Sequence, residues 1–505
     1  MNKLIHLPEP TLLFNHDQSV EDPRDGLSLF GPFDPAQTYG VRYGVIGTKD
    51  GIRRFLGWVE KIQHPVVDGD NMRGRPPFPG FEAAFGIPFS PKPLLRVEFE
   101  EADLMKHVLI GDRFKRSYET AGFFTERILE AIRTEEDKPN LWFVVAPEEV
   151  YKYCRPASTV GKELRIEAEG TMRPKEAIGL VQQPALFGQW NTNAIPYQYD
   201  PDFRNQIKGR LLSQAVLTQV LRESTLAHHE FLNKAGKPTR QLDKLQSQIA
   251  WNLGSAIYYK VGGKPWKLNG VRDGVCYVGL AFKRDEKNPN PQAACCAAQM
   301  FLDSGDGVVF KGNVGPWMTG KRGHFHLTTN AACELLSQAI DSYKAKHNNQ
   351  PPKELFIHGK VRFDEPEWHG FKEAAGSRTN VVGVKIDDAD DFRLYREHGS
   401  MPVLRGIALV QGERSAYLFS RGFTPRLQTY PGKEVPRALY VEVCGGEAPI
   451  ETVLQDVMGL TKLNYNSCRF ADGTPVTLKF ADAVGEVLIS GPSVPNAPLP
   501  FRHYI

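Results

Sequence analysis

The sequence predicts an α/β protein of two units, a Rossmann-like parallel sheet followed by an RNase H-like mixed sheet. Strand and helix signals alternate through residues 41–270, which is the pattern of strands joined by crossover helices. From Gly274 onward several strand signals come first and helices return later, which favours hairpins feeding a mixed sheet. With 505 residues, of which 41% are hydrophobic, the chain can bury two or three cores.

The first unit is expected to form a parallel sheet with a binding crevice at its carboxyl edge. The all-apolar run 141–145 is typical of a strand that is buried on both faces. Ile52, Phe55 and Val59 recur at helical spacing. Residues 155–200 are rich in Gly, Pro and Gln and are expected to be an irregular surface excursion. In chain order we expect strands at 43–46, 141–145 and 216–221, and helices at 49–62, 114–132, 147–153, 202–214 and 242–260.

The second unit is expected to begin with two strands and then to alternate strands with helices. The expected strands are 276–282, 307–314, 355–358, 381–386, 401–410, 416–419 and 439–443, and the expected helices are 331–346, 365–375, 450–460 and 480–489. Residues 1–40 are turn-rich, and we treat them as an extended N-terminal linker segment. The expected units are therefore 1–40, 41–270 and 271–505.

The composition narrows the class of protein. The formal net charge of +3 is too small to indicate a nucleic-acid partner, so any basic surface must be local. No apolar run approaches the ~20 residues of a membrane helix, and the first ten residues lack a signal-peptide core. The seven cysteines form no CxxC pair, and the adjacent Cys295 and Cys296 lie in an Ala-rich, helix-like stretch. Reduced thiols and a cytoplasmic location are expected.

A group of basic residues near the middle of the chain has the chemistry of an anion pocket. Lys260 ends an apolar helical run, and the Gly-Gly pair at 262–263 permits positive φ and close backbone approach. Arg204 and Lys208 are four residues apart, so they share one face of a helix. Gln219, at the end of the next expected strand, adds an amide donor. Several donors converging on a terminal phosphate form charge-assisted hydrogen bonds, whereas the alternative is an ordinary solvated helix face.

Short motifs along the chain match, in order and spacing, those of a known family. They are 22–27 (DPRDGL), 30–32 (FGP), the set Arg204, Lys208, Gln219 and Lys260, 262–266 (GGKPW), 278–280 (VGL), 405–406 (RG), 460–466 (LTKLNYN) and 504–505 (YI). Together they resemble short prokaryotic Argonautes, which carry only a MID and a PIWI domain. The resemblance covers essentially the whole chain. It implies that 41–270 is a MID domain binding the 5′-phosphate of a guide strand, and that 271–505 is a PIWI domain.

The resemblance also implies a divalent cation beside the guide phosphate. In related proteins the C-terminal carboxylate enters the MID pocket, so the carboxylate of Ile505 together with Gln219 would help to hold Mg²⁺. The alternative is a docked C-terminal segment with no metal ion. Several family members have tyrosine or histidine in the place of Arg204, and arginine keeps a donor and can stack on a base.

The PIWI domain is expected to bind nucleic acid without cutting it. A cutting PIWI domain needs acidic residues that hold two metal ions about 3.5–4 Å apart. At the first two aspartate positions of the family stand Ala281 and Lys360, and Asp482 falls at the position of the last ligand. One carboxylate cannot hold a metal pair. The alternative function is a guide-directed endonuclease.

Basic residues at expected strand ends and loops are candidates for backbone contacts along a guide–target duplex. They are Lys283, Arg284, Lys311, Lys321, Arg322, Arg405 and Arg426. For each of them the alternative is an ordinary surface charge. Nearby, His324 and His326 lie on one expected strand face, but no partner has metal-ligand spacing, so we expect a solvated hairpin there.

The resemblance implies a sensor rather than an enzyme. A 5′-phosphorylated guide RNA would pair with a single-stranded DNA target, and target binding would drive assembly of higher oligomers with an APAZ-domain effector protein. A TIR-APAZ effector would then act as an NADase and deplete NAD⁺ in defence against plasmids or phage. SIR2-APAZ or nuclease effectors are alternatives. A stand-alone small-molecule sensor built on the Rossmann-like unit is a further alternative.

Overall fold

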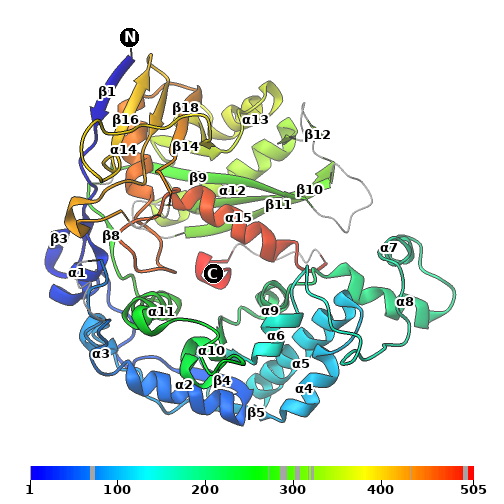
Figure 1. Ribbon diagram of the computed structural model, residues 1–505. Coiled ribbons are helices and arrows are strands. Elements are labelled where there is room, and N and C mark those ends of the chain that lie inside the picture. Colours follow the sequence, from blue (N-terminus) through cyan, green and yellow to red (C-terminus); the bar gives the residue numbers. More distant parts are fainter. Residues whose placement is uncertain are drawn as a thin grey trace.

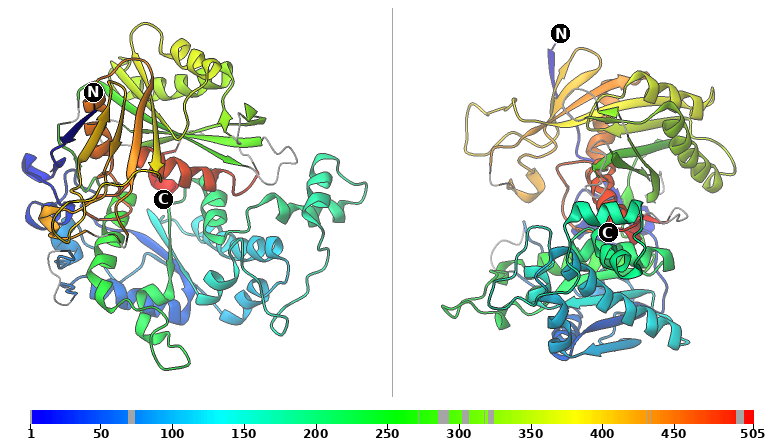
Figure 2. Two further views of the ribbon diagram at one scale, coloured as in Figure 1. Left: turned by 45° about the horizontal axis from the view of Figure 1, so that its top comes forward. Right: turned by 90° about the vertical axis from the view of Figure 1, so that its right-hand side faces the viewer.

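Two α/β lobes make up the computed structural model, and the C-terminus lies between them (Figure 1, Figure 2). The structure describes residues 2–68, 74–270, 272–284, 293–301, 307–316, 318–319, 324–430, 432, 434–492 and 499–505, with only the main chain described within 293–319. Among these residues no helix combines the length and the apolar character needed to cross a membrane.

The first lobe is built on a four-stranded sheet in the order β5-β4-β6-β7, and all its strand pairs are parallel. The strands are β4 (Tyr43–Thr48), β5 (Leu95–Phe99), β6 (Leu141–Ala146) and β7 (Thr218–Arg222). Every residue of β4 and β6 is buried, as expected for central strands covered on both faces. The predicted Rossmann-like parallel sheet is confirmed.

Helices cover both faces of this sheet. Neighbouring residues of β4 and β6 point to opposite sides, so each strand contributes side chains to two cores. Val45 and Phe143 belong to one core, and Ile46 and Val144 to the other. The first core is closed by α2 (Lys49–Lys61), α3 (Phe81–Phe85) and α11 (Gln246–Lys260). The second is closed by α4 (Glu101–Val108), α5 (Arg113–Thr134), α6 (Glu148–Tyr153) and α9 (Phe203–Leu211).

The excursion at 155–200 is more regular than expected. It contains α7 (Pro174–Gln182) and α8 (Gly188–Ala194), which protrude from the first lobe in Figure 1. Ala177 of α7, Ala194 of α8 and Tyr197 form a small buried cluster. The prediction of irregular structure was wrong here because both helices are short and bury few apolar residues, so hydrophobic spacing gives little signal.

The second lobe contains a nine-stranded mixed sheet in the order β1-β16-β17-β18-β15-β14-β9-β10-β11. Its central strand β14 pairs in parallel with β9 and β15, and its other strand pairs are antiparallel. This mixed topology confirms the predicted fold class. The strands are β1 (Asn2–His6), β9 (Val275–Arg284), β10 (Ala293–Phe301), β11 (Gly307–Pro316), β14 (Glu354–Gly359), β15 (Asn380–Ala389), β16 (Ile407–Gln411), β17 (Ser415–Leu418) and β18 (Ala438–Gly445).

Four helices cover the two faces of the mixed sheet. Helices α12 (Thr329–Lys346) and α13 (Glu365–Ala375) close a core with Val278 and Ile357. On the opposite face lie α14 (Ile450–Leu460) and α15 (Val476–Leu488). Helix α15 approaches β9 so closely that a Cβ at Gly279 would lie 2.0 Å from the carbonyl oxygen of Thr477. A glycine is therefore required at this crossing, which places α15 against the strand that carries Ala281.

Other segments also differ from the sequence predictions. Cys295 and Cys296 lie on β10, not on a helix, because pairing with both β9 and β11 decides the conformation of this Ala-rich stretch. The N-terminal segment is more than an extended linker: β1 completes the edge of the second sheet, and α1 (Pro23–Leu29) begins at the N-cap Asp22. The short strand β2 (Leu12–Leu13) also pairs with β8 (Lys267–Leu268).

Candidate functional site

Two buried lysines lie where the first lobe meets the C-terminal residues. Lys208 on α9 is 4% exposed, and Lys260, the last residue of α11, is 1% exposed. Arg204, one turn before Lys208 on α9, is exposed and forms no hydrogen bond or ion pair through its side chain within the described part of the chain. The structure thus brings together the basic residues that the sequence predicted.

Lys260 is held by two oxygen atoms at the start of β7. Its Nζ donates to the carbonyl oxygen of Thr218 at 2.9 Å and to Oε1 of Gln219 at 2.6 Å. Gln219 is the second residue of β7, so the cluster lies at the amino-terminal end of this strand. The predicted position of Gln219 at a strand end facing a carboxyl-edge crevice was wrong. The C-terminal end of α11 lies beside the first residues of β7, which brings the cations to the opposite edge of the sheet.

Lys208 contacts the C-terminal residues of the chain. Its Nζ donates to the carbonyl oxygen of Tyr504 at 3.1 Å. Tyr504 and Ile505 are both buried, and a 3-10 turn at Phe501–His503 precedes them. Residues at the end of the second lobe therefore form one wall of the lysine cluster, and Figure 2 shows this end of the chain between the two lobes.

Neither lysine has a carboxylate partner within the described residues. Burial lowers the pKa of Lys208 well below its ordinary value, and the charges of Arg204 and Lys260 lower it further. Burial and the charge of Arg204 likewise lower the pKa of Lys260 well below its ordinary value. Their acceptors are neutral carbonyl and amide oxygens, which compensate a buried charge poorly. An anion entering the cluster would supply the missing charge.

Two further basic residues, Arg502 and His503, were missed by the sequence reasoning. Arg502 Nε and His503 Nδ1 are buried and have no hydrogen-bond partner among the described residues. Burial lowers the pKa of His503 to about 4, with contributions from the charges of Arg502 and Lys260. Gly262 has a φ of +105°, and a Cβ there would lie 3.3 Å from Nη1 of Arg502. Their position directly before the Tyr504-Ile505 motif could have indicated from the sequence that they belong to the site.

The residues predicted to hold Mg²⁺ do not fit a metal ion by themselves. Oε1 of Gln219 already accepts a hydrogen bond from Lys260. The neighbouring side chains are cationic, and no described carboxylate side chain shifts the pKa of either lysine. Metal binding by the carboxylate of Ile505 stays a prediction.

In the second lobe the structure brings together Lys360, which follows β14, and Asp482 on α15. Lys360 Nζ donates to Oδ2 of Asp482 at 3.0 Å, and Lys283 Nζ lies 3.4 Å from Oδ1 of the same carboxylate. Burial raises the pKa of Asp482, but the hydrogen bond from Lys360 and the charge of Lys283 outweigh it, so the pKa is lowered. Ala281 lies two residues before Lys283 on β9 and therefore on the same face of the strand.

The prediction that Arg405 contacts a nucleic-acid backbone does not fit its position. Arg405 is 6% exposed; its Nε donates to Glu9 Oε2 at 2.9 Å, and its Nη2 donates to Thr461 Oγ1 at 2.8 Å. Lys462 Nζ also donates to Glu9, at 2.7 Å from Oε1. Burial raises the pKa of Glu9, and the charges of Arg405 and Lys462 reverse this and lower it. Arg405 therefore fastens the N-terminal segment to the second lobe.

The other predicted channel residues have different surroundings. Lys283 is paired with Asp482 and Glu486, whereas Arg284 is exposed at the end of β9. Arg426 is exposed and pairs with Asp25. The side chain of Lys311 on β11, and Lys321 and Arg322, lie outside the described residues.

Two α/β lobes, with a parallel sheet in the first and a mixed sheet in the second, define an Argonaute-like fold in which a MID domain precedes a PIWI domain. No family model and no curated protein sequence matches the chain. Solved structures do match it over nearly its whole length.

The chain is similar to Clostridium butyricum Argonaute bound to a guide DNA and a 19-mer target DNA, with a TM-score of 0.61 and 14% identity over 97% of this chain and 53% of the other. It is similar to Drosophila Piwi, with a TM-score of 0.58 and 12% identity over 99% and 56%. It is also similar to Aa-Ago with externally bound siRNA, with a TM-score of 0.55 and 14% identity over 99% and 56%. The chain therefore spans about half the length of these structures.

Proposed function

We propose that the chain holds the 5′-phosphate end of a guide strand in the cluster formed by Arg204, Lys208, Gln219 and Lys260. The observation that carries this proposal is the burial of two lysines that have no carboxylate partner in the described structure. A buried site that concentrates positive charge favours an anion that brings its own negative charge. The fold supports the same proposal, because the Clostridium butyricum structure contains a guide DNA and a target DNA.

A terminal phosphate suits this cluster better than a phosphodiester within a strand. A terminal phosphate carries roughly −1.5 to −2 charge near neutral pH and offers three acceptor oxygens. Lys208 and Lys260 are both buried and can approach it from two helices. A phosphodiester carries one charge, and the nucleotides on both sides of it would also have to enter the junction. Arg502 adds a guanidinium whose Nε has no partner among the described residues.

The bound guide, an RNA, would pair with a single-stranded DNA target, and the PIWI domain would hold the duplex without cutting it. In this proposal, Ala281 and Lys360 stand where two metal-binding carboxylates would be needed. The pairing of Asp482 with Lys360 and Lys283 supports it, because both oxygens of the remaining carboxylate face an ammonium group.

The consequence of target binding would be the activation of a separate effector protein. The resemblance to short Argonautes favours an APAZ-domain partner. A TIR-APAZ NADase is the favoured effector, and SIR2-APAZ or nuclease effectors are the alternatives. Target recognition would drive assembly of higher oligomers and NAD⁺ depletion in defence against plasmids or phage. The cytoplasm is the proposed compartment, in line with five cysteines that form no disulfide bond within the described structure.

The first test compares one guide RNA with a 5′-phosphate and with a 5′-hydroxyl. Binding of each RNA to the purified chain is measured at a fixed salt concentration, because contacts with the backbone are salt-dependent. We expect the phosphorylated strand to bind at least about tenfold more tightly, a difference of about 1.4 kcal/mol. Equal affinities would overturn the pocket assignment. A preparation that binds neither strand but binds a small molecule would favour the stand-alone sensor.

A further inference from the structure

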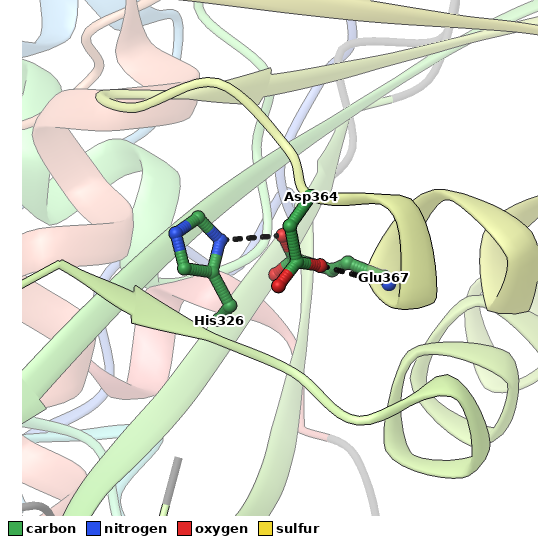
Figure 3. Close-up of side chains that lie close together, drawn as sticks. All are labelled: His326, Asp364 and Glu367. Atoms are coloured by element: carbon green, nitrogen blue, oxygen red, sulfur yellow. Dashed lines mark hydrogen bonds and ion pairs between the residues drawn. The ribbon is translucent and has the colours of Figure 1, made fainter. Parts of the chain in front are cut away.

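A second cluster of titratable side chains lies in the PIWI domain and shares no residue with the lysine cluster. His326 is on the short strand β13 (Phe325–His326), and Asp364 and Glu367 lie at the N-terminal end of α13. One ligand atom from each residue can be chosen so that all three lie within 4.8 Å of one another. Figure 3 shows the imidazole facing the two carboxylates. The expected hairpin is present, since β13 pairs antiparallel with β12 (Met318–Thr319). The expectation that it is solvated at His326 was wrong, because this side chain is 13% exposed.

Each carboxylate has one oxygen atom fixed by the main chain. Leu327 N donates to Glu367 Oε1 at 3.0 Å. Glu367 N donates at 3.0 Å to Oδ1 of Asp364, and Asp364 is the N-cap residue of α13. The second oxygen of Glu367 faces the imidazole, with 3.1 Å between Oε2 and Nδ1 of His326. Asp364 Oδ2 has no hydrogen-bond donor among the described residues. Oriented carboxylates of this kind are typical of metal ligands, whose geometry is set by an outer layer of hydrogen bonds.

Helices α12 and α13 are tied together beside the cluster, and no described lysine or arginine side chain pairs with its carboxylates. Thr329 Oγ1 donates to the carbonyl oxygen of Pro366 at 3.0 Å, which ties the start of α12 to the start of α13. Glu367 is 1% exposed, so its charge requires compensation. In the described part of the structure, no lysine or arginine forms an ion pair with Asp364 or Glu367. The imidazole of His326 is their nearby partner.

We propose that His326, Asp364 and Glu367 bind a divalent first-row transition metal ion such as Zn²⁺. Around a tetrahedral zinc ion with bonds of about 2.0–2.2 Å, two ligand atoms lie roughly 3.3 Å apart. The Nδ1–Oε2 distance of 3.1 Å is close to that spacing. One imidazole nitrogen and two carboxylate oxygens suit zinc better than Mg²⁺, which prefers oxygen ligands in octahedral geometry. Water would fill the fourth position.

Such an ion would join β13 to α13 and would fix the loop from β14 to α13. That loop begins at Lys360, which donates to Asp482, and ends at the ligand Asp364. The ion would therefore stabilise the loop that carries Lys360. Binding of Zn²⁺ to the folded chain should therefore raise the thermal midpoint.

The test is a calorimetric titration of Zn²⁺ into the purified chain after removal of metal with a chelator. We expect one saturable site in the wild type and in His369→Ala, a control that removes an exposed histidine from the same helix. His326→Ala and Asp364→Asn should weaken that site by at least about tenfold. Asp364→Asn is the sharper variant, because asparagine can still cap α13 while losing the charge.

A thermal scan with and without Zn²⁺ accompanies each titration. At one fixed Zn²⁺ concentration, we expect Zn²⁺ to raise the midpoint of the wild type and of His369→Ala more than that of Asp364→Asn. If His326→Ala does not fold, His326→Gln replaces it and keeps a hydrogen-bonding group toward Glu367. The absence of a saturable site in the wild type, or equal binding by wild type and Asp364→Asn, would overturn the proposal and leave a hydrogen-bonded ion pair only.

Discussion

The ammonium of Lys360 lies 3.0 Å from Oδ2 of Asp482, and the ammonium of Lys283 lies 3.4 Å from Oδ1 of the same carboxylate. Both oxygen atoms of Asp482 therefore face a cation that a metal ion would have to displace. The side chains of Lys360 and Asp482 are 55% and 37% exposed, so their ion pair contributes less than about 1 kcal/mol to stability.

This arrangement predicts that the chain leaves its target intact. A radiolabelled single-stranded DNA incubated with the guide-loaded chain and Mn²⁺ or Mg²⁺ should show no cut opposite the guide, because one neutralised carboxylate cannot hold two metal ions. Asp482→Asn should change guide and target affinity by less than about twofold. Cleavage that disappears in Asp482→Asn would instead establish the endonuclease alternative.

Reversal of both buried charges should eject the guide. We expect Lys208→Glu combined with Lys260→Glu to weaken binding of a 5′-phosphorylated RNA by at least about 100-fold, or about 2.8 kcal/mol, because two attractions become repulsions. The matched control is Lys234→Glu combined with Lys237→Glu, which makes the same charge change at exposed positions of the first lobe. Similar losses in both double variants would point to general electrostatics rather than a pocket.

Buried glutamates can unfold the site, so a neutral variant separates binding from stability. Lys260→Met keeps an unbranched side chain and removes a buried charge that has no carboxylate partner in the described structure. We expect it to raise the midpoint of chemical denaturation of the guide-free chain while still weakening the phosphorylated guide by about tenfold or more. A lower midpoint together with unchanged guide affinity would contradict the assignment of Lys260.

Acid should destabilise the guide-free chain partly through His503. Burial lowers the pKa of this imidazole from 6.5 to about 4, so the unfolded chain binds the proton more readily between these values. The contribution of His503 to the free energy of unfolding is therefore fully present above pH 6.5, falls progressively below it, and is lost once the pH has fallen through about 4. Denaturant titrations at pH 7, 5.5 and 4.5 should show a loss on the order of 2 kcal/mol in wild type relative to His503→Gln. Parallel pH profiles for the two proteins would refute this role.

Arg405 and Arg284 were predicted from sequence to be equivalent channel residues, and the structure separates them. Arg405→Ala should lower the free energy of unfolding by about 3–5 kcal/mol, because it removes a buried partner of Glu9. Arg284→Ala, at an exposed position, should leave stability within about 0.5 kcal/mol. If Arg284 contacts a phosphate, its loss should reduce the salt slope of duplex binding by about one. Chemical denaturation and binding at several salt concentrations measure both effects.

Local sequence patterns predicted much of the fold. The apolar run at β6, the helical spacing in α2 and the placement of most helices reflect interactions within one turn or one strand. Strand β10 was missed because its small residues carry no periodic signal and its conformation is decided by pairing with β9 and β11. Helices α7 and α8 were missed because their core is small.

Part of the candidate site could also be predicted from local spacing along the chain. Arg204 and Lys208 are four residues apart on one helix, so their shared face follows from helix geometry alone. The prediction for Arg405 was wrong because its sequence position shows a charge but not the ion pair that it forms with the distant Glu9. The partners of His326 were missed because Glu367 lies 41 residues further along the chain.

Two α/β units, the basic residues of the pocket, and an alanine and a lysine at positions 281 and 360 can be read from the chain alone. The packing of the lobes sets the cluster at the start of β7, brings Arg502 and His503 to it, and joins Lys208 to Tyr504. The difference lies in the range of the interactions. Helix and strand periodicity are set by neighbours along the chain, whereas Lys208 and Tyr504 are 296 residues apart and meet only because the two lobes pack together.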